Sequence, residues 1–297
     1  MECQHCRSKE VIPTRPNKHS QIHMYCKHCQ NYSKSPAAPR VLLFDIETSH
    51  TSVGVWQMGE QRIRWDQIER EQYIISWAAK WLFSPDTMGD VVTPKESKKR
   101  DDKRIVKSIH KLMSEADCVI THNGDKFDIK KLNWKYLLYG LTPNRRYTSI
   151  DTYKKSKEIF SAPSHAMDYL LKTMGYPGKH KMENEDWIRC EAGDQTALQK
   201  MYNYNLNDIF MLEDLYLRMR GWMKTHPNFA IFSEMYHELK NDETKCPRCT
   251  HTILKTKYTK RYQTPAGSIY KSCNCPHCGA VLRTRTTLRS SFSAEVK

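Results

Sequence analysis

The chain has 297 residues, of which 39% are hydrophobic and 27% are charged, a composition typical of a folded globular protein. No segment approaches the roughly 18 consecutive apolar residues that a membrane-spanning helix needs, and the first residues lack the apolar core of a signal peptide. These features predict a cytoplasmic protein without a membrane association. In a reducing compartment, cysteines are expected to serve as metal ligands rather than form disulfides, and the chain has 11 of them.

The net charge of +15 is concentrated at the two ends of the chain. Residues 1–40 contain 7 Lys and Arg against 2 acidic residues, and residues 245–297 contain 11 against 1, whereas residues 41–244 contain 30 of each. Basic segments around a neutral body predict modules that attract a polyanion such as nucleic acid. Basic ends that only aid solubility are the alternative, but the same segments also hold the cysteine clusters, which favours nucleic-acid binding.

The first predicted element is a small metal-binding module at 1–35. It contains two Cys-x2-Cys pairs with 19 residues between them: Cys3, Cys6, Cys26 and Cys29. This spacing predicts a zinc ribbon, because two intervening residues allow both sulfurs of a pair to face one tetrahedral ion. A closed shell of four thiolates leaves no position for substrate, so the zinc is expected to be structural. A segment rich in Ser, Pro and Ala at 33–40 is the predicted linker.

The central region, 36–240, opens with an apolar run at 41–49 that contains two acidic residues. Alternation along a strand places Asp45 and Glu47 on one face and Ile46 on the other. Two carboxylates this close repel each other unless a cation lies between them, so the pair predicts a site for Mg²⁺ or Mn²⁺. An Asp-x-Glu sequence after a strand is a weak signal when taken alone.

Further strands and helices follow in an order typical of a mixed sheet covered by helices. Strands are predicted at 72–82 and 117–121, with a less regular one near 87–93, and helices at 102–116, 127–139, 165–174 and 195–224. The charged run at 94–104 predicts a solvated loop, and the polar segment at 177–186 predicts a mobile loop over the site.

Two of these helices contain acidic residues at positions that suit a site. Asp128 is expected in the first turn of the helix after the strand at 117–121, where ligands bind in open α/β sheets. An acid favoured by the helix dipole is the alternative for this residue. Tyr204 and Asp208 are four positions apart and share a helix face. Asp208 adjoins an apolar stripe, where an acid without a cation is costly, although a surface aspartate beside a packed tyrosine is also possible.

A second metal-binding module is predicted at 241–297. It contains two further Cys-x2-Cys pairs with 25 residues between them: Cys246, Cys249, Cys275 and Cys278. They predict a second structural zinc ion, although Cys273 is close enough in sequence to compete as a ligand. The spacer alternates basic with aromatic or β-branched residues around a turn at 265–268, which predicts a hairpin.

One face of this hairpin is expected to present Lys255, Lys257 and Arg261 to nucleic acid. The tyrosines of the spacer would either stack on bases or pack over the zinc core: Tyr258, Tyr262 and Tyr270.

Taken in chain order, these motifs resemble the three exonuclease motifs of the DEDD superfamily of 3′→5′ exonucleases. The matching residues are Asp45 and Glu47, then the segment 123–128, then Tyr204 and Asp208. The tyrosine is similar to that of the subgroup (DEDDy) that includes the proofreading domains of family B DNA polymerases. Segment 73–82 also resembles ribonuclease H-like exonucleases of bacteriophage genomes. The resemblance covers roughly 41–225 and implies a ribonuclease H-like α/β domain, flanked here by two zinc ribbons.

The resemblance also implies a mechanism with two Mg²⁺ or Mn²⁺ ions. Asp45, Glu47 and Asp208 would hold one ion near the attacking water. Asp128 would support a second ion, shared through Asp45, near the leaving 3′ oxygen. Tyr204 would orient the water, because its ordinary pKa of about 10 makes it a poor base at neutral pH. Asn123 would position the terminal nucleotide.

The implied substrate is DNA rather than RNA, with proteins of replication or recombination as possible partners and the host cytoplasm as the location if a bacteriophage encodes the chain. Three alternatives stay open at this point. They are a structure-specific endonuclease, an RNA exonuclease and a non-catalytic scaffold that binds nucleic acid. A circular single strand separates the first from an exonuclease, which leaves it intact.

Overall fold

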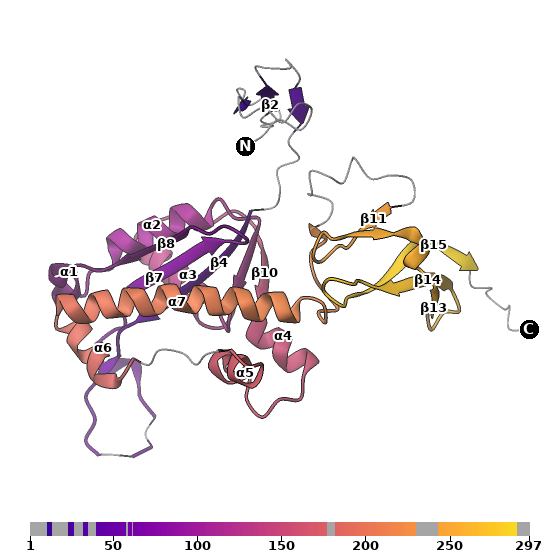
Figure 1. The fold of residues 1–297 in the computed structure, drawn as a ribbon. Helices are drawn as coiled ribbons and strands as arrows, with labels where there is room; N and C mark the ends of the chain where they lie inside the picture. Colours follow the sequence, from indigo (N-terminus) through magenta and orange to yellow (C-terminus); the bar gives the residue numbers. More distant parts are fainter. Residues whose placement is uncertain are drawn as a thin grey trace, which may run out of the picture. The chain divides into compact units, whose positions relative to one another are not determined.

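The computed structural model describes residues 11–13, 23–26, 32–34, 40–57, 59–60, 62–176, 182–229 and 243–289. The chain divides into two units, one of Arg40–His226 and the other of Met1–Pro39 together with Pro227–Lys297 (Figure 1). Each unit has its own β-sheets. Within the described residues, no helix is both long enough and apolar enough to span a membrane.

A five-stranded mixed sheet forms the centre of the unit 40–226. Its strands are β4 (Val41–Thr48), β7 (Ile74–Trp81), β8 (Thr87–Val91), β9 (Cys118–Thr121) and β10 (Thr148–Asp151). Their order is β10-β9-β4-β7-β8, in which β4, β9 and β10 are parallel and β7 is antiparallel to both β4 and β8. The first four residues of β4 are apolar and buried, as expected for a central strand covered on both faces.

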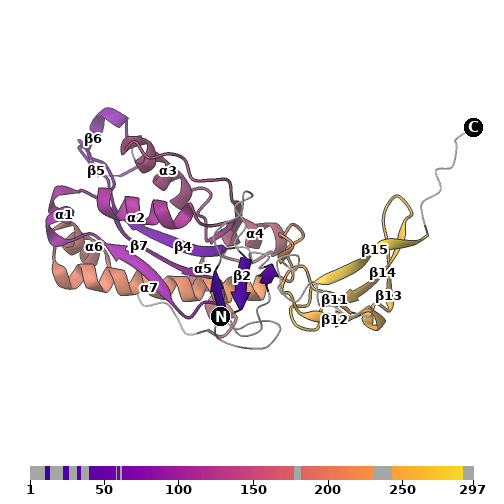
Figure 2. The ribbon, with the colours of Figure 1, turned by 90° about the horizontal axis from the view of Figure 1, so that it is seen from above.

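Helices cover both faces of this sheet. They are α1 (Pro94–Lys99), α2 (Lys103–Met113), α3 (Asp128–Leu138), α4 (Thr152–Ile159), α5 (Met167–Thr173), α6 (Asn184–Glu191) and α7 (Gln195–Met219). Figure 2 shows α2 and α3 on one side of the sheet and the long α7 across the other. Buried side chains of β4, α2 and α7, among them Phe44, Ile109 and Met201, belong to one core. The mixed α/β fold predicted from the sequence is confirmed.

The elements with clear periodicity were predicted correctly. The predicted strands at 41–46, 72–82, 87–93 and 117–121 correspond to β4, β7, β8 and β9. The predicted helices at 102–116, 127–139, 165–174 and 195–224 correspond to α2, α3, α5 and α7. Asp128 is the first residue of α3, as expected.

The prediction of a solvated loop at 94–104 is wrong. Residues Pro94–Lys99 form α1, whose first turn is closed by a reciprocal cap: Thr93 Oγ1 accepts from the Glu96 amide, and the Glu96 carboxylate accepts from the Thr93 amide. Asp102 is fully buried, where it accepts from the Ile74 amide at 2.7 Å and pairs with Lys135 at 2.8 Å. The buried charge of Asp102 is therefore paired by a residue distant in sequence.

The strand β10 and the helices α4 and α6 were not predicted from the sequence. Asp151 ends β10 and caps α4 by accepting from the Tyr153 amide at 3.0 Å. In the predicted loop at 177–186, residues 177–181 lie outside the described residues, and residues 184–186 form the first turn of α6.

A short antiparallel hairpin follows the acidic strand of the same unit. It pairs β5 (Ser52–Val53) with β6 (Ile68–Arg70), and the 3-10 turn η1 (Trp65–Gln67) immediately precedes β6. Trp56 and Trp65 are exposed in the segment between the two strands.

The N-terminal part of the other unit contains one described antiparallel sheet, of β1 (Val11–Pro13), β2 (His23–Cys26) and β3 (Tyr32–Lys34). The side chains of the four predicted zinc ligands of this module lie outside the described residues: Cys3, Cys6, Cys26 and Cys29. The N-terminal zinc ribbon therefore stays a prediction.

The C-terminal module contains two antiparallel sheets. One pairs β11 (Glu243–Lys245) with β12 (Thr252–Leu254), and the other has β13 (Lys260–Gln263), β14 (Ile269–Asn274) and β15 (Val281–Arg289) in that order. The predicted hairpin is confirmed by the pairing of Gln263 with Ile269 around a turn in which Gly267 has φ +84°. The three basic residues were expected on one face of this hairpin. Lys255 and Lys257 instead lie in the 3-10 turn η4 (Lys255–Lys257), whereas Arg261 lies in β13. The turn breaks the alternation from which the common face was predicted.

Candidate metal centres

Three carboxylates from β4 and α7 meet at one place in the unit 40–226. Asp45 and Glu47 on β4 and Asp208 on α7 each offer an oxygen atom, and these atoms all lie within 4.8 Å of one another. Asp208 is 2% exposed, and the other two are half-buried. The structure therefore brings together three of the four predicted acids.

Small residues on the neighbouring strands allow α7 to approach the sheet beside Asp45. Asp45 pairs with Ala78 of β7, and Ala78 pairs in turn with Gly89 of β8. A Cβ atom on Gly89 would lie 2.8 Å from the ring of Tyr202 on α7 and 3.0 Å from the Trp77 carbonyl. Because Ala78 has a small side chain and Gly89 has none, α7, the helix that carries Asp208, can pack close to the sheet beside Asp45.

Asn205, which the sequence analysis did not single out, joins these two elements. Its side-chain nitrogen donates to Asp45 Oδ2 at 2.8 Å, and its oxygen accepts from Ser76 Oγ at 3.1 Å. Asn205 is fully buried, so both of its contacts are protected from water. Its spacing of three residues from Asp208 on one helix was the available signal.

Asp128 lies beside this group but is not one of the three acids within 4.8 Å of one another. Its Oδ1 accepts from the amide of Ile46, between Asp45 and Glu47, at 3.1 Å. Burial raises the pKa of Asp128 to about 6, the hydrogen bond from Ile46 opposes that shift, and the nearby charge of Asp151 adds to it. The carboxyl group would therefore gain from a cation nearby.

The turn between β9 and α3 fixes where α3 begins. A Cβ atom on Gly124 would lie within 2.5 Å of Thr121 Cβ, so only glycine fits at this position. Asn123 adopts φ +69°, and its amide donates to Asp151 Oδ1 at 2.9 Å. The backbone of the predicted nucleotide-positioning residue is thus held by the cap of α4.

Tyr204 lies one turn before Asp208 on α7 and is half-buried. Its ring meets Trp187 of α6 edge-on, with the ring centres 6.3 Å apart. The indole nitrogen of Trp187 donates to the Thr48 carbonyl at the end of β4, at 3.2 Å. The tyrosine therefore packs against a residue that is itself tied to the acidic strand.

The donor set of this group fits a hard divalent cation. Asp45, Glu47 and Asp208 supply only carboxylate oxygens, which Mg²⁺ and Mn²⁺ prefer. Three ionised carboxylates this close repel one another, and a cation among them removes that cost.

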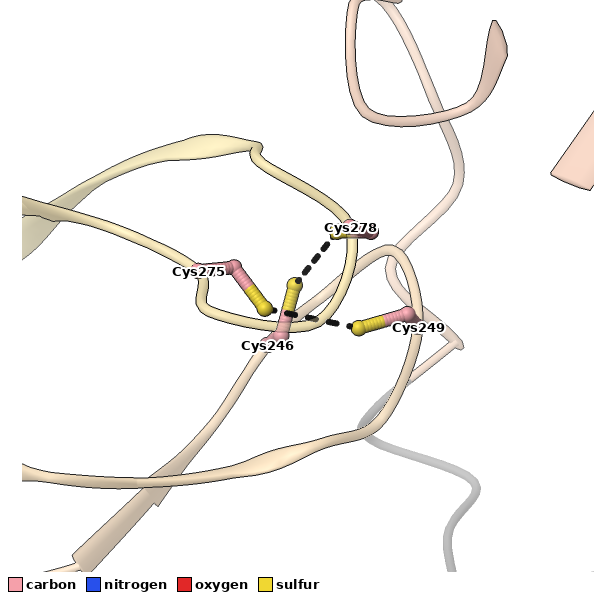
Figure 3. A group of neighbouring side chains, drawn as sticks. All are labelled: Cys246, Cys249, Cys275 and Cys278. Atoms are coloured by element: carbon pink, nitrogen blue, oxygen red, sulfur yellow. Dashed lines mark hydrogen bonds between the residues drawn. The ribbon is translucent and has the colours of Figure 1, made fainter. Parts of the chain in front are cut away.

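The second candidate centre is in the C-terminal module (Figure 3). The sulfur atoms of four cysteines lie within 4.8 Å of one another: Cys246, Cys249, Cys275 and Cys278. Cys246 and Cys278 are 3.7 Å apart and Cys249 and Cys275 are 3.6 Å apart, sulfur to sulfur. A tetrahedral zinc ion with Zn–S bonds of about 2.3 Å requires sulfurs about 3.8 Å apart, whereas a disulfide requires about 2.05 Å. The spacing therefore fits four thiolates around one zinc ion.

Two residues near this cluster bear on the alternatives left open by the sequence. Cys273 is buried but is not one of the clustered cysteines, and burial raises the pKa of its thiol. Tyr258 packs against the core that contains Cys246 and Ile253. Within the clustered set, the hydrogen bond between Cys246 and Cys249 lowers the pKa of Cys246 and raises that of Cys249, so the two thiols share one proton more readily than two.

Three comparisons with known proteins bear on these centres. A family model described as the RNase H superfamily matches residues 42–220. No curated protein matches the sequence. Among solved structures, the chain is similar to the family B DNA polymerase from the hyperthermophilic archaeon Pyrobaculum calidifontis, with 15% sequence identity and a TM-score of 0.45. That match covers 61% of this chain but only 24% of the polymerase chain.

Proposed function

We propose that this chain, which belongs to the RNase H superfamily, is a metal-dependent 3′→5′ exonuclease of the DEDDy type that acts on single-stranded 3′ ends of DNA. The superfamily and the five-stranded mixed sheet are shown by the family match and by the structure. The strand polarity, the choice of DNA and the two-metal mechanism belong to the proposal.

The observation that carries the proposal is the meeting of Asp45, Glu47 and Asp208 within 4.8 Å. A lone acidic pair on a strand is common, but a third acid from a distant helix, buried against the same point, is costly without a cation. The contact from Asn205 to Asp45 supports this view, because it holds one carboxylate in place by a fully buried group.

In the proposal, each of the motif residues has one task. Asp45, Glu47 and Asp208 hold one Mg²⁺ or Mn²⁺, and Asp128 supports a second. Bound divalent ions supply Lewis acidity for in-line hydrolysis of a phosphodiester. Tyr204 orients the attacking water through its hydroxyl group.

The flanking modules have a different task in the proposal. Segment 36–240 carries the chemistry, whereas the modules at 1–35 and 241–297 each hold a structural zinc ion and bind nucleic acid. The four-cysteine cluster at 246–278 supports this for the C-terminal module, because a closed thiolate shell leaves no open position for catalysis. Replication or recombination proteins remain proposed partners.

The test uses single-stranded DNA labelled at its 5′ end, with Mg²⁺ or Mn²⁺. The expected result is a ladder that shortens stepwise from the 3′ end. Asp45→Ala abolishes the ladder, and Asp86→Ala, which removes an exposed aspartate away from the cluster, leaves it unchanged.

Each alternative predicts a different pattern in the same assay. Cleavage of circular single strands would replace the proposal with an endonuclease, and faster cleavage of RNA would replace DNA as the substrate. If linear and circular DNA and RNA all stay intact while binding persists, the chain is a binding scaffold and the proposal is wrong.

A further inference from the structure

A groove of about 910 Å³ runs along β15 in the C-terminal module. Residues 281–288 form one wall, and side chains from before and within the hairpin complete it: Lys245, Pro247, Lys255, Tyr258 and Lys271. In the described segment 243–289, β15 pairs with β14 alone, so its other edge is unpaired there.

The charge of the groove has one sign. Lys245, Lys255, Lys271, Arg283 and Arg285 all line it, and no acidic side chain is among its lining residues. The segment 245–289 contains ten Lys and Arg and no Asp or Glu. Because no carboxylate is among the described residues that line it, the groove attracts a polyanion.

The groove also meets an aromatic surface through Arg283. The guanidinium of Arg283 lies 4.2 Å from the ring centre of Tyr270 and 5.9 Å from that of Tyr262. Tyr262 is exposed, and Val281 and Leu288 in the wall are 63% and 50% exposed. Flat aromatic and guanidinium groups beside exposed aliphatic side chains suit the faces of unpaired bases.

We propose that this groove binds single-stranded nucleic acid, with its lysines and arginines on the phosphates and the Tyr262–Arg283–Tyr270 surface under the bases. Bases in a duplex are stacked and cannot reach such a surface, which is why a single strand fits better. The nine residues of β15 span about 30 Å, enough for several nucleotides of an extended strand. The choice of nucleic acid as ligand rests on the proposed function, but binding at this groove needs none of the catalytic carboxylates.

This site differs from the face expected from the sequence. Lys255 belongs to both, but Lys257 and Arg261 are exposed and do not line the groove. The chain therefore offers a matched control within the same module and with the same number of charges.

The test measures the affinity of the full chain for a fluorescent single-stranded oligonucleotide without added Mg²⁺ or Mn²⁺, so that the ligand stays uncut. One variant carries Lys271→Gln and Arg285→Gln, and the control carries Lys257→Gln and Arg261→Gln. Losing two phosphate contacts is expected to weaken binding about tenfold. It should also make the slope of the logarithm of the binding constant against the logarithm of the salt concentration less steep by about 1.4, since each contact with a single strand contributes roughly 0.7. The control is expected to stay within about threefold of the parent.

Arg283→Lys tests the base surface separately, because it keeps the charge and removes the planar group. It is expected to weaken single-strand binding several-fold without changing the salt dependence. Zinc content and circular dichroism verify that each variant is folded.

Three results would overturn the proposal. Equal losses in the two paired variants would mean that charge alone, without a groove, attracts the ligand. A duplex that competes as well as a single strand would remove the role of the base surface. An acidic peptide that competes as well as the oligonucleotide would make the edge of β15 a peptide site.

The groove and the exonuclease can fail independently. If binding depends on the groove residues but DNA stays uncut in Mg²⁺, the groove proposal is supported and the proposed function is wrong. Stepwise cleavage by the parent, together with groove variants that bind the oligonucleotide as tightly as the parent, would support the proposed function and contradict the groove.

Discussion

Asn205 joins Asp45 on the central strand to Ser76 on its neighbour, from the helix that carries Asp208. Asn205→Ala is expected to lower activity about 10-fold to 100-fold, as for residues that orient metal ligands. Because Asp45 loses its orientation, the variant should need more Mg²⁺ for half-maximal rate. Rate measured against Mg²⁺ concentration detects this shift.

Asn203→Ala provides the control on the same helix, because Asn203 is exposed and its side chain accepts from Gln199, one turn earlier on α7. It should behave as the parent does. A loss in Asn205→Ala with an unchanged Mg²⁺ requirement would mean that Asn205 only stabilises the fold.

Gly124 sits where no side chain fits, before the helix that begins at Asp128. Gly124→Ala places a methyl group within 2.5 Å of Thr121 Cβ, so the turn must move. We expect a loss of about 1–3 kcal/mol in the free energy of unfolding, together with lower activity because Asp128 moves with the turn. Urea unfolding and the exonuclease assay measure the two effects, and an unchanged unfolding midpoint would contradict the clash.

At this scale, the carboxylates that meet in the fold could be predicted from the sequence, but the residues that hold them in place could not. Asp45, Glu47 and Asp208 stand out because acids next to apolar runs are unusual. Asn205 and Ser76 look like ordinary polar residues, and their importance depends on which strand lies beside which helix. That proximity is tertiary information, which local spacing does not contain.

At the scale of elements, the helices and strands with a local sequence signal were predicted, and those that depend on tertiary contacts were missed. The helix α7 was predicted because its apolar periodicity is long, and the strands β4 and β9 were predicted because each contains a short, continuous apolar run. The short helix α1 is stabilised by partners outside its own sequence, and its charged composition was read as a loop. Glu96 illustrates this, because it caps α1 and also pairs with Arg104 on α2.

Glu96 gives α1 a dependence on pH. Its hydrogen bonds with Arg104, the largest cause, lower its pKa from 4.5 to about 2. A carboxyl group with a lowered folded-state pKa stabilises the fold above its ordinary pKa, and that contribution is lost as the pH falls from about 4.5 towards 2.

Glu96→Gln should therefore destabilise the protein at pH 7 by roughly 1 kcal/mol, a small effect because solvent screens the half-exposed Arg104. The difference from the parent should shrink as the pH falls below 4.5. Urea unfolding at pH 7 and at pH 3 measures it, and a difference that grows at low pH would show that Glu96 acts in another way.

For the whole molecule, the excess of positive charge and the carboxylates of the proposed active site lie in different parts of the chain. The residues 41–244 are neutral overall, which permits a cluster of carboxylates, whereas the basic residues accumulate in the cysteine-containing segments. This division was visible in the sequence, because it depends on counts along the chain and not on packing. The position of the groove was not visible, because it depends on how β15 lies against residues before the hairpin.

The division predicts that the two kinds of metal can be removed with different consequences. Replacing Cys275 and Cys278 by Ser leaves two thiolates, too few for a closed zinc shell, so the C-terminal module should lose its zinc ion and its fold. The carboxylates proposed to be catalytic all lie in 40–226, so the maximal rate in Mg²⁺ should stay within about threefold of the parent. The KM for single-stranded DNA should rise, and its increase between 50 and 200 mM salt should become less steep, because fewer cations contact phosphates.

Steady-state kinetics at the two salt concentrations, with zinc content measured in parallel, test this. A maximal rate that falls as far as in Asp45→Ala would mean that the module takes part in catalysis itself, and the assignment of binding and chemistry to separate segments would be wrong.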